Sequence, residues 1–333
     1  GQGQAPARQA AFKGGLPKSA GAVTLSKMCG SGMKAAMFAH DMLLAGSHDV
    51  MVAGGMESMT NAPHLLLKGR SGIRIGHDRI YDHMMLDGLE DAYEPGRAMG
   101  TFGEECAAKY NFSREAQDAF ATASVNRAKA ATESGAFKAE ITPVTVKGRA
   151  GDTVISIDEG PGKVKLDKIP TLKPAFKKDG TITAASSSSI NDGAAALVMM
   201  RASTAAKLGV KPLARIVAHA MHAQEPNWFT TAPVGATQKA LAKAGWSVKD
   251  VDLWEVNEAF AVVPMALMEE LKVSHDIVNV NGGACALGHP IGAGGARIMV
   301  TLIHALQARG GKRGLATLCI GGGEGTAVAL ELL

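Results

Sequence analysis

The chain has 333 residues, of which 46% are hydrophobic and 20% charged, and its formal net charge is +4 at pH 7. These values are typical of a globular protein long enough to divide its core between domains. The positive charge forms no basic block, which argues against nucleic acid as a partner. No apolar run approaches the roughly 18 residues of a membrane span. The four cysteines lack CxxC spacing, so we expect a cytoplasmic protein, with an organellar address as the alternative.

The first 57 residues contain one clear helix and one clear strand. Residues 31–46 place Met33, Met37 and Leu44 near one face and end at Gly46, which predicts a helix. The run DVMVAGG at 49–55 predicts a strand that is buried on both faces. The opening GQGQAPARQAAFKGGLP lacks the apolar centre of a signal peptide, and we expect it to lie inside a domain.

Two further zones follow. Residues 58–190 are more polar and irregular, with a helix-like stretch at 114–131. The run NDGAAALVMM at 191–200 predicts a second buried strand. Residues 212–333 return to alternating apolar strands and helices, which is typical of an α/β protein.

The first and third zones share one order of features. Each has a corner residue, a glycine-rich helix start, a helix and an apolar strand that ends in glycines. The closing strands also correspond, NDGAAALVMM in one zone and GEGTAVALEL in the other. We infer an α/β fold of two related halves: 1–57 with 191–211, and 212–333, with 58–190 inserted in the first. A chance match of generic strand–helix patterns is the alternative.

Cys29 stands in SKMCGSGMKA, at a glycine-flanked corner directly before the predicted helix. The N–H groups and dipole of a helix start stabilise a thiolate, so this position predicts a lowered pKa and a nucleophilic thiol. Gly30 and Gly32 allow the backbone to turn tightly and a substrate to approach. A small buried hydrophobic residue is the alternative for Cys29 taken alone.

Two more corners carry reactive side chains. His289 stands in GHPIG, where proline prepares a helix start, at the matching place in the second half. A histidine there could accept the proton of Cys29, and a packed or surface histidine is the alternative. Cys319 ends an apolar strand in CIGGGEG, and the N–H groups of the glycines from Gly321 onward could hold an oxyanion.

The remaining polar motifs are weaker. Asn257 and Glu258 follow an apolar strand in WEVNEAF, where an asparagine could anchor a water or an oxyanion, or only cap a helix. Cys285 and Cys106 are expected to serve packing. The sequence has no GxxxxGK[ST] loop and no strand–GxGxxG–helix unit, so no nucleotide-binding fold is indicated.

A metal site is not predicted. His77, Asp78, Asp82 and His83 cluster in a loop-like segment, but their spacing matches no zinc signature.

Taken together, six motifs resemble the thiolases, in particular the acetyl-CoA acetyltransferases and β-ketothiolases. They are SKMCGSGMKA, MVAGGMESM, NDGAAALV, VNEAFA, GGACALGHPIGAGGAR and CIGGGEG, and they occur in the family's order over essentially the entire chain. The resemblance implies two βαβαβαββ-type halves that form a layered αβαβα core, with a loop domain inserted in the first half. It also implies a transferase of fatty acid metabolism that works without a cofactor.

The resemblance assigns roles to five residues. Cys29 matches the nucleophile that accepts the acyl group, and His289 the histidine that activates it and helps form one oxyanion hole. Asn257 matches the asparagine that holds the water in that hole. Cys319 matches the acid and base at the α-carbon of the second thioester. The N–H groups of Cys29 and Gly321 would form the other oxyanion hole.

The resemblance further implies acetyl-CoA, coenzyme A and 3-ketoacyl-CoA as ligands and a homodimer or homotetramer as the assembly. By motif position, the residues expected to contact substrate are Met99, Phe176, Ser188 and Phe260. Candidates for the coenzyme A phosphates, among which the sequence does not choose, are Lys68, Arg70, Arg74 and Arg79.

Three departures from the family pattern stand out. Ala98 occupies a position where many biosynthetic members have histidine, which leaves acyl chain length open. Glu324 replaces a common glutamine or methionine. The family's opening β–α units do not precede Gly1, so we expect the first half to be incomplete. Two rival functions remain: a ketoacyl synthase, which would carry histidine in place of Cys319, and a non-catalytic lipid carrier, which would lack part of the reactive set.

Overall fold

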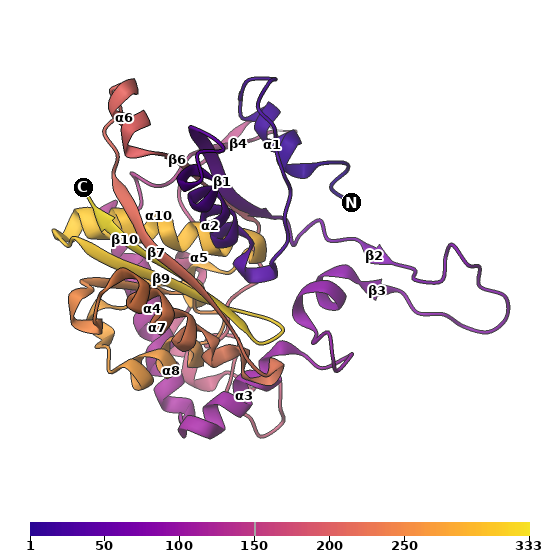
Figure 1. Ribbon diagram of the computed structural model, residues 1–333. Coiled ribbons are helices and arrows are strands. Elements are labelled where there is room, and N and C mark those ends of the chain that lie inside the picture. Colours follow the sequence, from indigo (N-terminus) through magenta and orange to yellow (C-terminus); the bar gives the residue numbers. More distant parts are fainter. Residues whose placement is uncertain (150) are drawn as a thin grey trace.

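The computed structural model describes residues 1–149 and 151–333. Its centre contains two sheets with helices between them, and further helices cover the outer face of the second sheet (Figure 1). In the first sheet, β1 (Val50–Glu57) pairs antiparallel with β6 (Gly193–Met200). The second sheet has the strand order β7–β10–β9–β8. Its strands are β7 (Ala214–Ala223), β8 (Leu253–Val256), β9 (Arg313–Ile320) and β10 (Glu324–Leu332).

The strands of the second sheet run in mixed directions. Both β7 and β9 are antiparallel to β10, whereas β8 is parallel to β9. A tight turn joins β9 to β10, and Gly322 and Gly323 adopt φ of 91° and 87° there, a conformation that favours glycine. This turn therefore presents a nearly bare backbone at the end of two buried strands.

Two helices, α2 (Ser31–Leu44) and α10 (Ile291–Arg309), lie between the sheets. Their buried side chains form one core with the facing strands. The first turn of α2 crosses the second turn of α10 closely: a Cβ on Gly32 would lie 2.8 Å from the backbone N of Ala296. A Cβ on Gly295 would lie 2.6 Å from the N of Met33. The residues just before the two helices are thereby brought to one end of the central layer.

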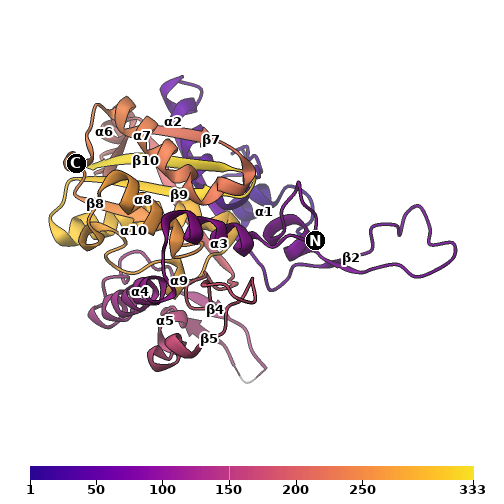
Figure 2. The same ribbon diagram turned by 90° about the horizontal axis from the view of Figure 1, so that it is seen from below.

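The other face of the second sheet is covered by α7 (Ala232–Ala244), with α8 (Val262–Leu271) and α3 (Met99–Tyr110) packed alongside (Figure 2). Phe102, Phe229, Trp254 and Leu267 belong to the core formed there. The catalytic candidates at the ends of β8 and β9 therefore lie between two packed helical layers.

The remaining elements are shorter or lie at the periphery. They are α1 (Pro6–Lys13), η1 (Met28–Gly30), β2 (His64–Leu65), β3 (Tyr81–Asp82), the π-helix η2 (Met85–Leu89), α4 (Arg114–Ser134), β4 (Val144–Val146), β5 (Thr153–Ile155), α5 (Gly160–Lys163), η3 (Leu166–Thr171), α6 (Ala202–Leu208), η4 (Pro226–Thr231), η5 (Val248–Asp250), η6 (His275–Ile277) and α9 (Ala284–Leu287). The chain between β2 and β3 projects from the body (Figures 1 and 2). Within residues 1–149 and 151–333, every helix is too short or too polar to cross a bilayer.

The predicted helix at 31–46 and strand at 49–55 are confirmed as α2 and β1. The order α2, β1 and antiparallel β6 recurs as α10, β9 and antiparallel β10. The prediction that β1 and β6 are buried on both faces is wrong. Helices α2 and α10 cover one face, and Val50, Val52 and Val198 are exposed on the other. The division into 58–190 and its flanking halves stays a prediction.

Candidate active site

The corner that carries Cys29 is the short helix η1, directly before α2. Met28 adopts φ 46°, a left-handed conformation that turns the chain. The Ser31 hydroxyl donates to the carbonyl of Met28 at 2.8 Å and accepts from the N–H of Lys27 at 2.8 Å, which holds the turn. A Cβ on Gly30 would lie 2.4 Å from Cδ1 of Ile320, so glycine lets the corner pack on the end of β9.

The Cys29 thiol lies within hydrogen-bond reach of two backbone donors. Burial raises the pKa of Cys29 to about 11, although the N–H groups of Gly321 and of Cys29 itself lower it. The charge of Glu57 raises it further. The prediction of a lowered pKa is therefore wrong: desolvation outweighs the donors of the helix mouth, and the thiol is protonated at neutral pH.

His289 occupies the corresponding corner before α10. Gly288 turns the chain with φ 83°, and the N–H of His289 donates to the carbonyl of Ser189 at 3.1 Å. Only 6% of the residue is exposed. Burial, aided by the charge of Arg297, lowers the pKa of His289 to about 4. The imidazole is therefore neutral at pH 7 and able to accept a proton.

Asn257 follows β8 and reaches the histidine. Its Nδ2 lies 3.4 Å from Nε2 of His289, and its backbone N–H donates to the carbonyl of Thr317 at 3.0 Å. The neighbouring Glu258 points away into the core, where it accepts from the Ser124 hydroxyl at 2.6 Å and from Asn279 Nδ2 at 2.8 Å. Because successive side chains point to opposite sides, Asn257 faces His289 whereas Glu258 holds Ser124 and Asn279 in the core.

Cys319 is 1% exposed and lies one residue before the end of β9. Burial raises its pKa well above the ordinary value, and the nearby Cys29 adds to that effect. A thiol that serves as acid and base would be expected to titrate near neutrality, but desolvation keeps Cys319 protonated at pH 7. Two protonated thiols therefore lie close together, and the N–H of Gly321 lies within hydrogen-bond reach of the Cys29 thiol.

The four predicted substrate contacts are gathered beside these residues. Met99 covers Gly321, since its Cε would lie 3.3 Å from a Cβ there. Phe176 meets Phe260 edge to face with ring centroids 5.7 Å apart. The N–H of Ser188 donates to the carbonyl next to Phe260, that of Ala259, at 3.0 Å. Their contact with a ligand stays a prediction.

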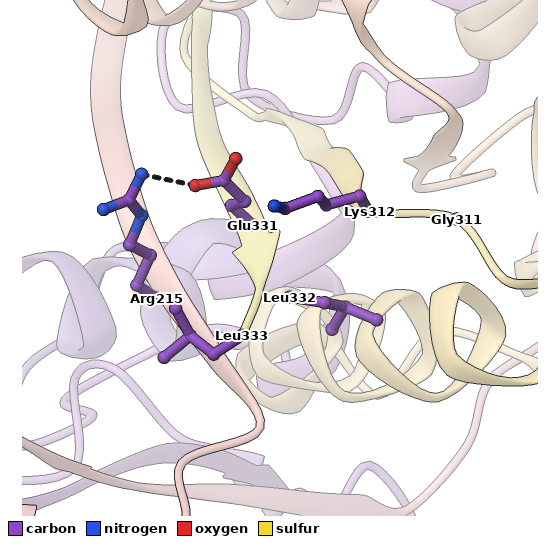
Figure 3. Close-up of a pocket in the computed structure, with 6 residues that line it drawn as sticks. All are labelled: Arg215, Gly311, Lys312, Glu331, Leu332 and Leu333. Carbon is purple, nitrogen blue, oxygen red and sulfur yellow. Dashed lines mark ion pairs between the residues drawn. The ribbon is translucent and has the colours of Figure 1, made fainter.

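Other candidates lie elsewhere. All four candidate cations belong to the chain between β2 and β3, which projects away from the body (Figure 1): Lys68, Arg70, Arg74 and Arg79. Figure 3 shows a hollow lined by Arg215, Gly311, Lys312, Glu331, Leu332 and Leu333. It lies at the far end of β10 from the Gly321–Gly323 turn, about 25 Å along the strand, so it is not part of this site.

Sequence reasoning missed two charged contacts at the site. Lys27 forms an ion pair with Glu324, which links the Cys29 corner to the β9–β10 turn. A carboxylate oxygen of Glu57 accepts from the N–H of Gly292 at 3.0 Å, in the first turn of α10. The sequence marks Glu324 as unusual, but its partner Lys27 lies 297 residues earlier in the chain, a separation that no local pattern bridges.

Removing the charge of Glu324 tests that ion pair. Glu324→Gln is expected to slow turnover several-fold and to lower the unfolding free energy by about 1 kcal/mol or less, because the pair is only partly buried. The matched control is Glu159→Gln, which breaks an exposed pair with Lys163 and should change neither quantity. Equal effects of the two substitutions would show that the Lys27 contact does not position the site.

Alkylation measures the protonation of Cys29 directly. The rate at which iodoacetamide modifies Cys29 in the substrate-free protein is expected to rise with pH up to about 11, because only the thiolate reacts. Mass spectrometry of the Cys29 peptide across a pH series gives this rate. A rate that levels off below about pH 8 would contradict the neutral thiol.

Both parts of the chain match models of one protein family. Residues 1–203 match the family model "Thiolase, N-terminal domain", and residues 210–332 match "Thiolase, C-terminal domain". The acetyl-CoA acetyltransferase of Chromobacterium violaceum is 51% identical over 333 residues, which are 99% of this chain and 85% of that protein.

Two solved structures share the fold. The acetyl-CoA acetyltransferase of Bacillus anthracis superposes with a TM-score of 0.95 at 41% identity, over 99% of this chain and 84% of that one. A thiolase of Ascaris suum in complex with coenzyme A gives a TM-score of 0.93 at 41% identity, over 100% and 85%. The matched models, the identity and the shared fold establish that this chain belongs to the thiolase family.

Proposed function

We propose that the protein is an acyl-CoA acyltransferase. It condenses two acetyl-CoA, or acetyl-CoA and a longer acyl-CoA, to a 3-ketoacyl-CoA, and it cleaves the product with coenzyme A in the reverse direction. One observation carries the proposal: the N–H of Gly321 lies within hydrogen-bond reach of the Cys29 thiol, and Cys319 lies close enough to Cys29 for that group to raise its pKa. The relatives named acetyl-CoA acetyltransferase support the substrate class.

The cleavage direction begins from the protonation states described above. Neutral His289 accepts the proton of Cys29 as the sulfur attacks the 3-keto carbonyl. The N–H groups of Cys29 and Gly321 stabilise the oxyanion that forms. The carbon–carbon bond then breaks, Cys319 gives its proton to the α-carbon, and acetyl-CoA leaves with Cys29 acylated.

The second half-reaction restores the enzyme. The thiol of coenzyme A loses its proton to the Cys319 thiolate and attacks the acyl group on Cys29. The shortened acyl-CoA departs, and the Cys29 sulfur takes back the proton held by His289. Condensation is the same path reversed, with the Cys319 thiolate removing the α-proton and Asn257 and His289 facing the thioester oxygen of the enolate. Free coenzyme A is a substrate of cleavage and a product of condensation, and no cofactor takes part.

Thiolysis of acetoacetyl-CoA by free coenzyme A tests this function, followed by loss of the enolate absorbance. The parent is expected to consume the substrate, and Cys29→Ser is expected to be inactive because its hydroxyl is a much weaker nucleophile. Longer 3-ketoacyl-CoAs, assayed in parallel, show which acyl chain lengths the enzyme accepts with alanine at position 98. A folded parent that ignores all free coenzyme A thioesters but accepts carrier-protein thioesters would instead be a ketoacyl synthase. Light scattering on the same sample tests the proposed dimer or tetramer.

A further inference from the structure

Two histidines and an aspartate converge outside the active site. His40 and Asp41 are adjacent on α2, and His219 lies on β7, which runs beside it (Figure 1). Nε2 of His219 is 3.2 Å from Nδ1 of His40 and 3.0 Å from Oδ1 of Asp41. Nδ1 of His40 is 3.6 Å from the same Oδ1. Three potential ligand atoms thus form a small triangle.

Hydrogen bonds do not satisfy all three atoms while both imidazoles are neutral and Asp41 is a carboxylate. A neutral His219 carries at most one proton on Nε2, which two acceptors would have to share. If the proton sits instead on Nδ1 of His40, the lone pair of His219 Nε2 faces the Asp41 carboxylate at 3.0 Å. Either arrangement leaves electron-rich atoms opposed, and one central cation removes that conflict.

The dimensions fit a metal ion. Zinc binds imidazole nitrogen and carboxylate oxygen at about 2.0–2.2 Å in a tetrahedron, whose ligand atoms are then about 3.3–3.6 Å apart. The observed 3.0, 3.2 and 3.6 Å bracket that spacing with little movement. We propose that His40, Asp41 and His219 bind a divalent first-row metal ion of the Zn²⁺ class, with water as the fourth ligand.

The surroundings decide how tightly such an ion is held. The His219 side chain is only 13% exposed, so the ion would be held partly away from water. Asp41 is more than half exposed, which leaves a route for the ion and its water. Lys34 lies near Asp41 and Lys243 near His219, and the positive charge of both lysines opposes binding of a cation. Each already has another partner: Lys34 lies over the Phe38 ring, and Lys243 donates to the carbonyl of His219 at 3.1 Å. Lys243→Met is therefore expected to tighten binding.

The site would join the two halves of the chain. Helix α2 starts beside Cys29, and β7 is the edge strand of the second sheet. His40 lies about 16 Å along the helix from Cys29, so the ion is structural and takes no part in acyl transfer. The residue separation of about 180 explains why spacing in the sequence gave no hint of the site.

Cobalt is the probe, because tetrahedral Co²⁺ absorbs strongly in the visible range whereas the hydrated ion absorbs weakly. Metal-stripped protein is titrated with Co²⁺, and Zn²⁺ is added to displace it. The parent is expected to develop the tetrahedral spectrum, and Zn²⁺ at a large excess over its Kd is expected to raise the unfolding midpoint by a few degrees. His219→Gln and Asp41→Asn should lose both effects, while His48→Gln, an exposed histidine just beyond α2, should keep them.

The active-site thiols are the competing ligands, and the same experiment separates them. A spectrum that survives in His219→Gln and Asp41→Asn but disappears in Cys29→Ser would overturn the proposal and assign the ion to the active site. Absence of any tetrahedral spectrum in the parent would overturn it as well. Thiolysis is measured alongside: Asp41→Asn and metal-stripped parent are expected to retain it, so this result stands independently of the acyl transfer reaction.

Discussion

Replacing Cys319 by alanine is expected to slow acetoacetyl-CoA thiolysis by about 10³-fold, because general acid–base groups contribute about 10²–10⁴-fold. Transfer of an acetyl group from acetyl-CoA to Cys29 is expected to survive. Cys319 only gives a proton to the departing coenzyme A in that step, and a thiolate of ordinary pKa can leave without one, whereas a carbanion at the α-carbon cannot. The Cys29 thiol, neutral His289 and the two backbone donors all remain in place. The two half-reactions would thus become separable.

Intact-protein mass spectrometry after mixing with acetyl-CoA measures the acyl transfer, and the absorbance assay measures thiolysis. Cys106→Ala is the matched control, since this thiol is fully buried in α3 and plays no part in the chemistry proposed above. It should retain both steps. Loss of acetylation in Cys319→Ala would mean that coenzyme A cannot leave without the Cys319 proton, and full thiolysis would remove the proposed role of Cys319.

The positions of the reactive residues could be predicted from the sequence because each stands at the end of an element that the sequence marks clearly. Glycines and a proline punctuate the corners at Cys29 and His289, and apolar strands lead to Asn257 and Cys319. The ends of strands and helices in a layered α/β fold gather at one edge of the layers. The glycines, the proline and the apolar runs in the sequence were therefore enough to identify the reactive residues.

The electrostatics of the site could not be predicted in the same way. The helix start and its N–H groups are visible in the sequence and predict a lower pKa for Cys29, but the burial that raises it to about 11 comes from distant segments. Ile320 and Met99 close around that corner from β9 and α3. Desolvation is a tertiary quantity, and here it reverses the sign of the local effect.

Polar contacts between distant segments could not be predicted from the sequence for a related reason. The ion pair of Lys27 with Glu324 and the cluster around His219 join segments far apart in the chain. Exposure of one face of β1 likewise depends on which helices cover it, and the apolar run alone predicted burial on both faces. The hydrophobic pattern of a strand shows which of its faces are apolar. The elements that pack against those faces depend on the topology of the whole fold.

The orientation of His289 depends on a single glycine. Gly294 lies on α10 under the imidazole, and a Cβ there would come within 2.7 Å of both Cε1 and Nδ1 of the ring. No side chain fits at that distance, so the ring must move if Gly294 is replaced. Because the position is helical, alanine suits its backbone and favours the helix by about 1 kcal/mol.

Gly294→Ala is therefore expected to lower kcat by about 10²-fold, since a displacement of roughly 1 Å at a catalytic group costs that much. His289→Ala removes the base itself and is expected to lower kcat by about 10²–10⁴-fold, which is the largest loss that displacement of the ring could cause. Unlike a damaged fold, Gly294→Ala should unfold at the same temperature as the parent or a higher one. Gly162→Ala, where a Cβ would meet nothing within 4 Å, should leave kcat unchanged. Full activity in Gly294→Ala would show that the imidazole can move without loss, and that the packing of α10 beneath it does not set the geometry of proton transfer from Cys29.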